Sequence, residues 1–174
     1  MPRSLVTSAY NERRADCERA VAAVRRQEPG VRALRDVDLA MLARATDLDP
    51  VAEMRARHII EEDERVLRTI DALAEHDLVS VGELFAASHA SLRDLFEVSC
   101  PELDLLVDIS AGTPGVVAAR MTGAGFGGCI VALAMPDAVD TLWARIERDY
   151  PAQTGRTPRL WQVRAVAGAG ELSA

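Results

Sequence analysis

The chain has 174 residues and a net charge of −7, with 49% hydrophobic and only 4% aromatic residues. This length suits one domain with a sizeable core, which aliphatic and alanine side chains must fill. All 20 basic residues are arginines, and no stretch combines clustered basic residues with aromatic ones. We therefore expect no nucleic-acid partner.

The N-terminus and the cysteines both favour a cytoplasmic location. The chain opens with Met1-Pro2-Arg3 and no apolar signal region, and no apolar run reaches membrane-spanning length, so no membrane partner is expected. Cys17, Cys100 and Cys129 are odd in number and too widely spaced for a zinc knuckle or a redox pair. We expect reduced, mostly buried thiols and no metal site.

The first half of the sequence predicts helices after a short extended segment. Residues 5–8 are expected to be extended and residues 11–28 to form a helix, followed by an ambiguous segment at 37–45. Asp49-Pro50 is typical of an N-cap and first-turn proline, and predicts a long helix to about residue 76. Its expected apolar stripe consists of Ile59, Val66, Ile70 and Leu73.

The next segment predicts two more helices. Apolar residues at helical spacing from Val81 to Phe96 include one polar member, Ser88, which would need a partner if buried. A second helix starts at Pro101 and runs to about Ala111. Its N-cap is either Ser99, in a capping box with Glu102, or Cys100.

The last third predicts a strand-rich α+β arrangement, with an antiparallel sheet covered by helices on one face. Residues 116–122 and 129–134 are expected to be strands, the second buried on both faces because it is almost entirely apolar. A helix beginning near Val139 follows. A final strand is expected with Trp161, Val163 and Ala165 on one face.

Between the two strands lies the most informative stretch, Met-Thr-Gly-Ala-Gly-Phe-Gly-Gly at residues 121–128. Gly123, Gly125 and Gly128 fit a dinucleotide-binding spacing, but that motif needs a helix immediately afterwards, and here a strand follows. The glycines permit positive φ and leave N–H groups uncovered, which suits contact with phosphate. A bulged hairpin without a ligand explains the same residues equally well.

Other polar residues are weaker candidates. His58 with Glu62 at one-turn spacing would hold a metal only if further ligands converged, and a surface hydrogen bond is the more frequent role. The acidic run at 61–64 and the pair Arg13-Arg14 are interpreted as solvated helix faces.

Three stretches resemble the galactokinases, within the GHMP small-molecule kinases, and they occur in the family's order. Arg120 to Cys129 is similar to the third family signature, and residues 5–14 and 88–104 resemble two further segments. Two departures occur: Ala124 stands where many members have glycine, which is a small change, and Leu95-Phe96 replaces a more polar pair, which removes polar groups. The resemblance implies an antiparallel ferredoxin-like sheet with packed helices, as in the C-terminal domain of GHMP kinases, over residues 1–174.

The resemblance also implies roles for individual residues. Tyr10 occupies the place of a tyrosine that hydrogen-bonds a sugar hydroxyl, although a rim aromatic would suit the same position. The loop Gly123, Ala124, Gly125, Phe126, Gly127 and Gly128 would back the phosphate site. No catalytic residue is expected here, because the family's phosphate loop, its catalytic acid and most contacts to ATP and magnesium lie in an N-terminal half whose motifs are absent from this sequence.

These features imply the C-terminal part of an enzyme that phosphorylates galactose at the C1 hydroxyl with ATP, inactive as an isolated chain. Two alternatives stay open: a related sugar kinase acting on N-acetylgalactosamine or arabinose, and a non-catalytic binding or regulatory module. Without an N-terminal half, apolar surface near Tyr10 and the glycine loop would be uncovered, so we expect self-association.

Overall fold

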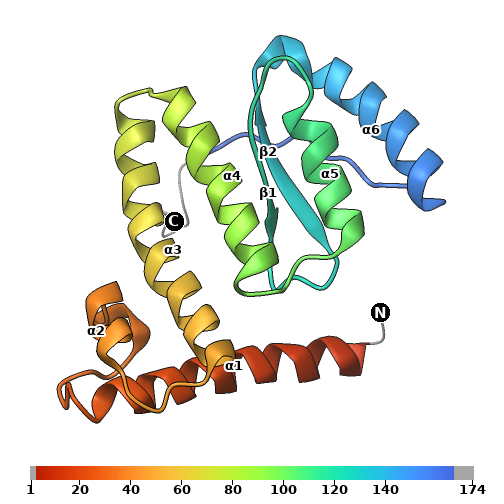
Figure 1. Cartoon of the computed structure of the whole chain (residues 1–174). Helices are drawn as coiled ribbons and strands as arrows, with labels where there is room; N and C mark the ends of the chain where they lie inside the picture. Colours follow the sequence, from red (N-terminus) through yellow and green to blue (C-terminus); the bar gives the residue numbers. More distant parts are fainter. Residues whose placement is uncertain (1–2, 167–174) are drawn as a thin grey trace, which may run out of the picture.

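The structure is a computed structural model that describes residues 3–166, so the opening Met1-Pro2 lies outside the described residues (Figure 1). Most of the chain is helical, and two antiparallel strands form the sheet. The elements are α1 (Arg3–Arg25), η1 (Leu34–Asp36), α2 (Leu39–Arg44), α3 (Pro50–Ala74), α4 (Leu78–Asp94), α5 (Pro101–Ala111), β1 (Val116–Thr122), β2 (Cys129–Ala134), η2 (Pro136–Ala138) and α6 (Val139–Thr154).

Helices flank the strand pair and extend away from it. Helices α4 and α5 pack against β1, α6 packs against α5, and α3 lies along α4 (Figure 1). Helix α1 crosses the end of α3 and points its N-terminal half toward the end of the sheet that carries the glycine loop (Figure 1). The α+β class and the antiparallel strand pair are therefore confirmed.

Helix α1 corrects one prediction and relocates a candidate residue. Residues 5–8 are helical instead of extended, so α1 runs unbroken from Arg3 to Arg25. Val6 and Thr7 favour strands locally, but each residue added to an existing helix gains a hydrogen bond without a new nucleation cost. Tyr10 consequently lies inside a helix and not at a junction.

The start of α3 matches the prediction, whereas its apolar stripe does not. The Asp49 carboxylate accepts a hydrogen bond from the Ala52 backbone N–H at 2.9 Å, and Pro50 occupies the first turn. Ile59 packs against a core formed by α1, α2 and α3. Val66, Ile70 and Leu73 are about half exposed, because α4 covers a different side of the helix.

Ser88, on α4, has the partner that its burial requires. Its hydroxyl donates a hydrogen bond to the Glu62 carboxylate, which also accepts from Arg65 and lies 3.5 Å from Arg120 Nη1. Glu62 is thus an interior hydrogen-bond partner of Ser88 and not part of a solvated face, although it belongs to the acidic run at 61–64. The N-cap of α5 is Cys100.

The strand pair differs from the prediction at its outer strand. The register joins Thr122 to Cys129 and Met121 to Ile130, with an irregularity between Val116 and Ala118. Strand β1 is mostly buried, but β2 is exposed or half-buried along its whole length, because no further strand pairs with it among residues 3–166.

The expected final strand does not form. Residues 156–166 have no regular secondary structure, and Trp161 and Val163 are largely exposed. The alternation of apolar and polar residues is present, but a strand also needs a hydrogen-bonded neighbour, and the described sheet contains only β1 and β2.

In residues 3–166 no helix combines the length and the apolar character needed to cross a lipid bilayer. The three cysteines are free thiols. Cys17 and Cys100 are half-buried, whereas Cys129 at the start of β2 is exposed, contrary to the expectation of burial.

Candidate functional site: the glycine loop and the helix facing it

The loop between β1 and β2 has an unusual run of left-handed backbone. Gly123, Gly125, Gly127 and Gly128 have φ values of +85°, +83°, +123° and +97°, and Phe126 has +60°. Glycine adopts such angles without the steric penalty that a side chain adds. The prediction of positive φ in this loop is confirmed.

One glycine is required by a close contact as well as by its backbone angle. A methyl group added to Gly125 would lie 2.7 Å from Val98 Cβ and closer still to the Val98 carbonyl oxygen. The next residue, Phe126, donates its backbone N–H to the same carbonyl at 2.7 Å. The Phe126 ring packs against the core cluster that contains Val98 and Met121. Phe126 therefore anchors the loop.

The other glycines of the loop are open to approach. A Cβ atom added at Gly123, Gly127 or Gly128 would meet no atom within 4 Å. Small residues with uncovered N–H groups beside a fixed anchor suit the approach of an anionic ligand such as phosphate.

The α4–α5 turn, residues 95–98, fixes the anchor point of the loop. Each of its four successive carbonyl oxygens accepts a hydrogen bond from a distant part of the chain. Leu95 accepts from Arg55 Nη1, Phe96 from Arg13 Nε at 2.6 Å, Glu97 from Arg13 Nη2 at 3.0 Å and Val98 from the Phe126 N–H at 2.7 Å.

Arg13 thereby joins α1 to both the turn and the loop. Besides its two carbonyl acceptors, its guanidinium lies over the Phe126 ring, 5.9 Å from the centroid. The side chain is only 15% exposed. The interpretation of Arg13-Arg14 as a solvated pair is wrong for Arg13 and right for Arg14, which is exposed and pairs with Glu18.

Arg55 supports the turn from α3. Its side chain is 4% exposed, its Nη2 donates to the Glu97 carboxylate, and its Nε lies 3.6 Å from Asp16 Oδ2. That last separation is an ion pair and not a hydrogen bond, since Nε has no hydrogen-bond partner. Local sequence patterns cannot reveal either arginine, because their partners lie far along the chain.

Tyr10 lies on the same helix as Arg13 and is 53% exposed. Residues three apart on a helix share a face, so Tyr10 lies on the side of α1 from which Arg13 reaches the glycine loop. Arg13 contacts the loop through Phe126, and the roles of Tyr10 and of the glycine loop stay predictions.

Two buried histidines contact this region, His58 at Phe96 of the turn and His89 at Met121 of β1. His58 Nδ1 is 2.8 Å from Ser91 Oγ, its ring stacks on Phe96 with centroids 4.6 Å apart, and burial lowers its pKa to about 4. His89 Nδ1 accepts the Met121 N–H at 3.3 Å, and burial lowers its pKa too. His89 Nε2 is 3.1 Å from Asp104 Oδ1 but without hydrogen-bond geometry. Both rings are structural.

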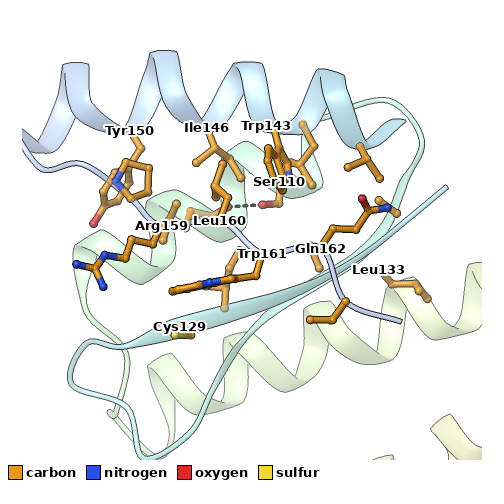
Figure 2. Close-up of a pocket in the computed structure, with 18 of the residues that line it drawn as sticks. Ser110, Cys129, Leu133, Trp143, Ile146, Tyr150, Arg159, Leu160, Trp161 and Gln162 are labelled. Atoms are coloured by element: carbon orange, nitrogen blue, oxygen red, sulfur yellow. Dashed lines mark hydrogen bonds between the residues drawn. The ribbon is translucent and has the colours of Figure 1, made fainter. Parts of the chain in front are cut away.

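An apolar cavity of about 830 Å³ lies between β2, α5, α6 and residues 157–164, and Gly128 at the end of the glycine loop also lines it (Figure 2). Trp161 and Cys129 face it from one side and Trp143 and Ile146 from the other (Figure 2). Its walls are mainly apolar side chains, and no Asp, Glu or His is among the residues that line it. No group of three or more His, Cys, Asp or Glu side chains within residues 3–166 is arranged to hold a metal ion.

Comparison with known proteins agrees with this arrangement. Residues 69–152 match the family "GHMP kinases C terminal". The galactokinases of Roseiflexus sp. and Chloroflexus aurantiacus are 42% and 46% identical to the chain, over 98% and 95% of its length. That of Haemophilus influenzae is 45% identical over 89%.

A solved structure gives the same result. The crystal structure of Lactococcus lactis galactokinase complexed with galactose matches 90% of the chain with a TM-score of 0.81 and 36% identity. The chain spans only 40% to 44% of the length of the relatives named above, and 41% of this structure. Residues 69–152 therefore match the C-terminal domain of GHMP kinases, and over most of its length the chain corresponds to the C-terminal part of galactokinases.

Proposed function

We propose that this chain supplies the C-terminal part of an enzyme that transfers the γ-phosphoryl group of ATP to the C1 hydroxyl of galactose. The observation that carries the proposal is the anchored glycine loop, with open space at Gly123, Gly127 and Gly128, which Arg13 contacts from the helix that also carries the exposed Tyr10. The similarity to galactokinases across nearly all of the chain supports the choice of reaction.

Each element has a definite role in this proposal. The Tyr10 hydroxyl hydrogen-bonds the sugar, and the backbone at Gly123, Gly127 and Gly128 backs the phosphate site. Phosphoryl transfer depends on positioning and on neutralising phosphate charge. We assign no catalytic acid and no magnesium ligand to this chain, because in the resemblance these belong to the family's N-terminal half.

The chain alone is expected to lack kinase activity, and activity is expected when an N-terminal galactokinase half is co-expressed with it. A coupled assay of ADP release with galactose and ATP measures both. Turnover by the isolated chain at roughly one per second, an ordinary enzyme rate, would contradict the proposal that the chain needs an N-terminal half for activity. Higher kcat/KM with N-acetylgalactosamine or arabinose would favour a related sugar kinase. Stable partner binding without any kinase activity would favour a non-catalytic binding or regulatory module.

In the completed enzyme, Tyr10→Phe tests the sugar contact. Loss of one hydrogen bond of about 0.5–1.5 kcal/mol is expected to lower kcat/KM for galactose by about 2- to 12-fold. The KM for ATP should stay unchanged, because the phenol faces the sugar. Arg14→Gln, an exposed change on the same helix, serves as the control. Equal galactose kinetics for the two variants would remove Tyr10 from the site.

A further inference from the structure

We propose that Arg13 is a positioning residue that couples the Tyr10-bearing helix to the glycine loop. The inference rests on the proposed function for its catalytic meaning, whereas the coupling itself is a property of this chain. The contacts of Arg13, the support given by Arg55 and the shape of the loop each contribute to it.

Arg13 holds two consecutive carbonyls with one side chain. Its Nε and Nη2 donate to Phe96 and Glu97, at 2.6 and 3.0 Å, while its guanidinium plane lies over Phe126. A planar fork with several fixed donors can make all three contacts at once, whereas a lysine ammonium is a single point charge. The geometry is specific to arginine.

The turn that Arg13 holds is under constraint. Glu97 has φ +52°, a left-handed conformation that costs energy in a residue with a side chain and persists where the surroundings fix it. Arg55 fixes it from the second helix, through the Leu95 carbonyl and the Glu97 carboxylate. Glu97, which is half exposed, pairs with both guanidinium groups, and Asp16 pairs with Arg55 and also with Arg19.

The α4–α5 turn, held by Arg13 and Arg55, sets the position of the glycine loop. The Val98 carbonyl accepts the Phe126 N–H, and Gly125 packs too closely on Val98 to tolerate a methyl group. A shift of the turn must therefore move the loop. Because Tyr10 and Arg13 share a face of α1, Arg13 sets the position of the glycine loop relative to the proposed sugar contact.

Amide hydrogen exchange of the full chain tests the coupling without any kinase assay. The probe is the Phe126 N–H, compared in Arg13→Gln and in Arg14→Gln, its exposed neighbour. We expect the Phe126 amide to exchange at least tenfold faster in Arg13→Gln and within twofold of the unmodified chain in Arg14→Gln. Amides in the middle of α4 should be unaffected in both.

Arg13→Lys provides the second variant, since it keeps the charge if the glutamine variant fails to fold. Its Phe126 amide should exchange at least threefold faster than that of Arg14→Lys, because an ammonium cannot replace the fork. Phe126 exchange equal to that of the Arg14 controls, in whichever Arg13 variant folds, would overturn the proposal.

Kinetics of the completed enzyme provide the catalytic readout. Arg13→Lys is expected to lower kcat at least tenfold relative to Arg14→Lys while each KM stays within threefold, as for a residue that aligns bound substrates. A rise in galactose KM with unchanged kcat would overturn the positioning role. If the unmodified chain gives no active enzyme with an N-terminal half, the proposed function fails while the exchange result still decides the coupling.

Discussion

Gly123 and Gly125 have almost the same backbone angle, φ +85° and +83°, in different surroundings. A methyl group at Gly123 meets open space, whereas one at Gly125 meets Val98. This pair separates the cost of a left-handed backbone from the cost of a steric clash.

We expect Gly123→Ala to lower the free energy of unfolding by about 1–2 kcal/mol, the penalty of a side chain in that conformation. Gly125→Ala should lower it by about 1–3 kcal/mol more, because Val98 and the turn must move. Urea unfolding followed by circular dichroism measures both variants of the chain. Equal unfolding midpoints would show that the Val98 contact relaxes without cost.

His58 makes the stability of the fold depend on pH. Its pKa is about 4 in the fold and 6.5 for the free side chain, so the native state holds the neutral ring. Below pH 6.5 the unfolded chain binds a proton that the folded chain does not. The stabilisation is thus complete above pH 6.5 and is lost as the pH falls toward 4, by up to about 3 kcal/mol.

His58→Asn should weaken this loss, because the variant retains a hydrogen-bonding group near Ser91 without a titrating ring. Urea unfolding at pH 7 and pH 4.5 gives the difference for each protein. His76→Asn is the control, since His76 is exposed and asparagine tolerates its left-handed backbone, φ +58°. An equal drop in the His58→Asn variant and the unmodified chain would exclude His58 as the cause.

Local signals in the sequence identify helices and strands more reliably than they identify what packs against them. Asp49-Pro50 predicts the start of α3, and the apolar runs around the glycines predict β1 and β2, because caps and glycine turns act over a few residues. The spacing of Val66, Ile70 and Leu73 shows that one side of α3 is apolar. It cannot show whether another element covers that side.

The candidate site was predictable only in part for the same reason. The residues of the glycine loop and their positive φ follow from their identity. The role of Tyr10 stays a prediction, although its exposure on α1 suits it. The arginine contacts escape sequence analysis, because Arg13 and the turn are separated by 83 residues and nothing near Arg13 marks it as buried.

The molecule as described exposes apolar surface on the outer side of α3. Val66, Leu67, Ile70 and Leu73 are 47% to 64% exposed. This surface is additional to the exposed ring of Tyr10, around which the sequence placed the expected apolar area. Contiguous apolar side chains on a soluble chain promote association.

We expect the purified chain to self-associate through this side of α3, and Leu67→Glu/Ile70→Glu to shift it toward monomer in analytical ultracentrifugation. Arg68→Glu changes the net charge by the same amount on the same exposed stretch, and so controls for repulsion. If that control dissociates the chain as fully as the double variant does, charge and not apolar contact governs the association.

The hydrogen bonds of Arg13 also set an order of events during synthesis. Helix α1 leaves the ribosome before the α4–α5 turn, because the carbonyl acceptors of Arg13 lie 83 and 84 residues later in the chain. Phe126 emerges later still. Contacts between distant segments form after local ones, because the intervening chain must first be ordered. We therefore expect the contacts of Arg13 with the turn and with Phe126 to form later than the packing of α1 against α2 and α3, and the glycine loop to reach its final shape only when they form.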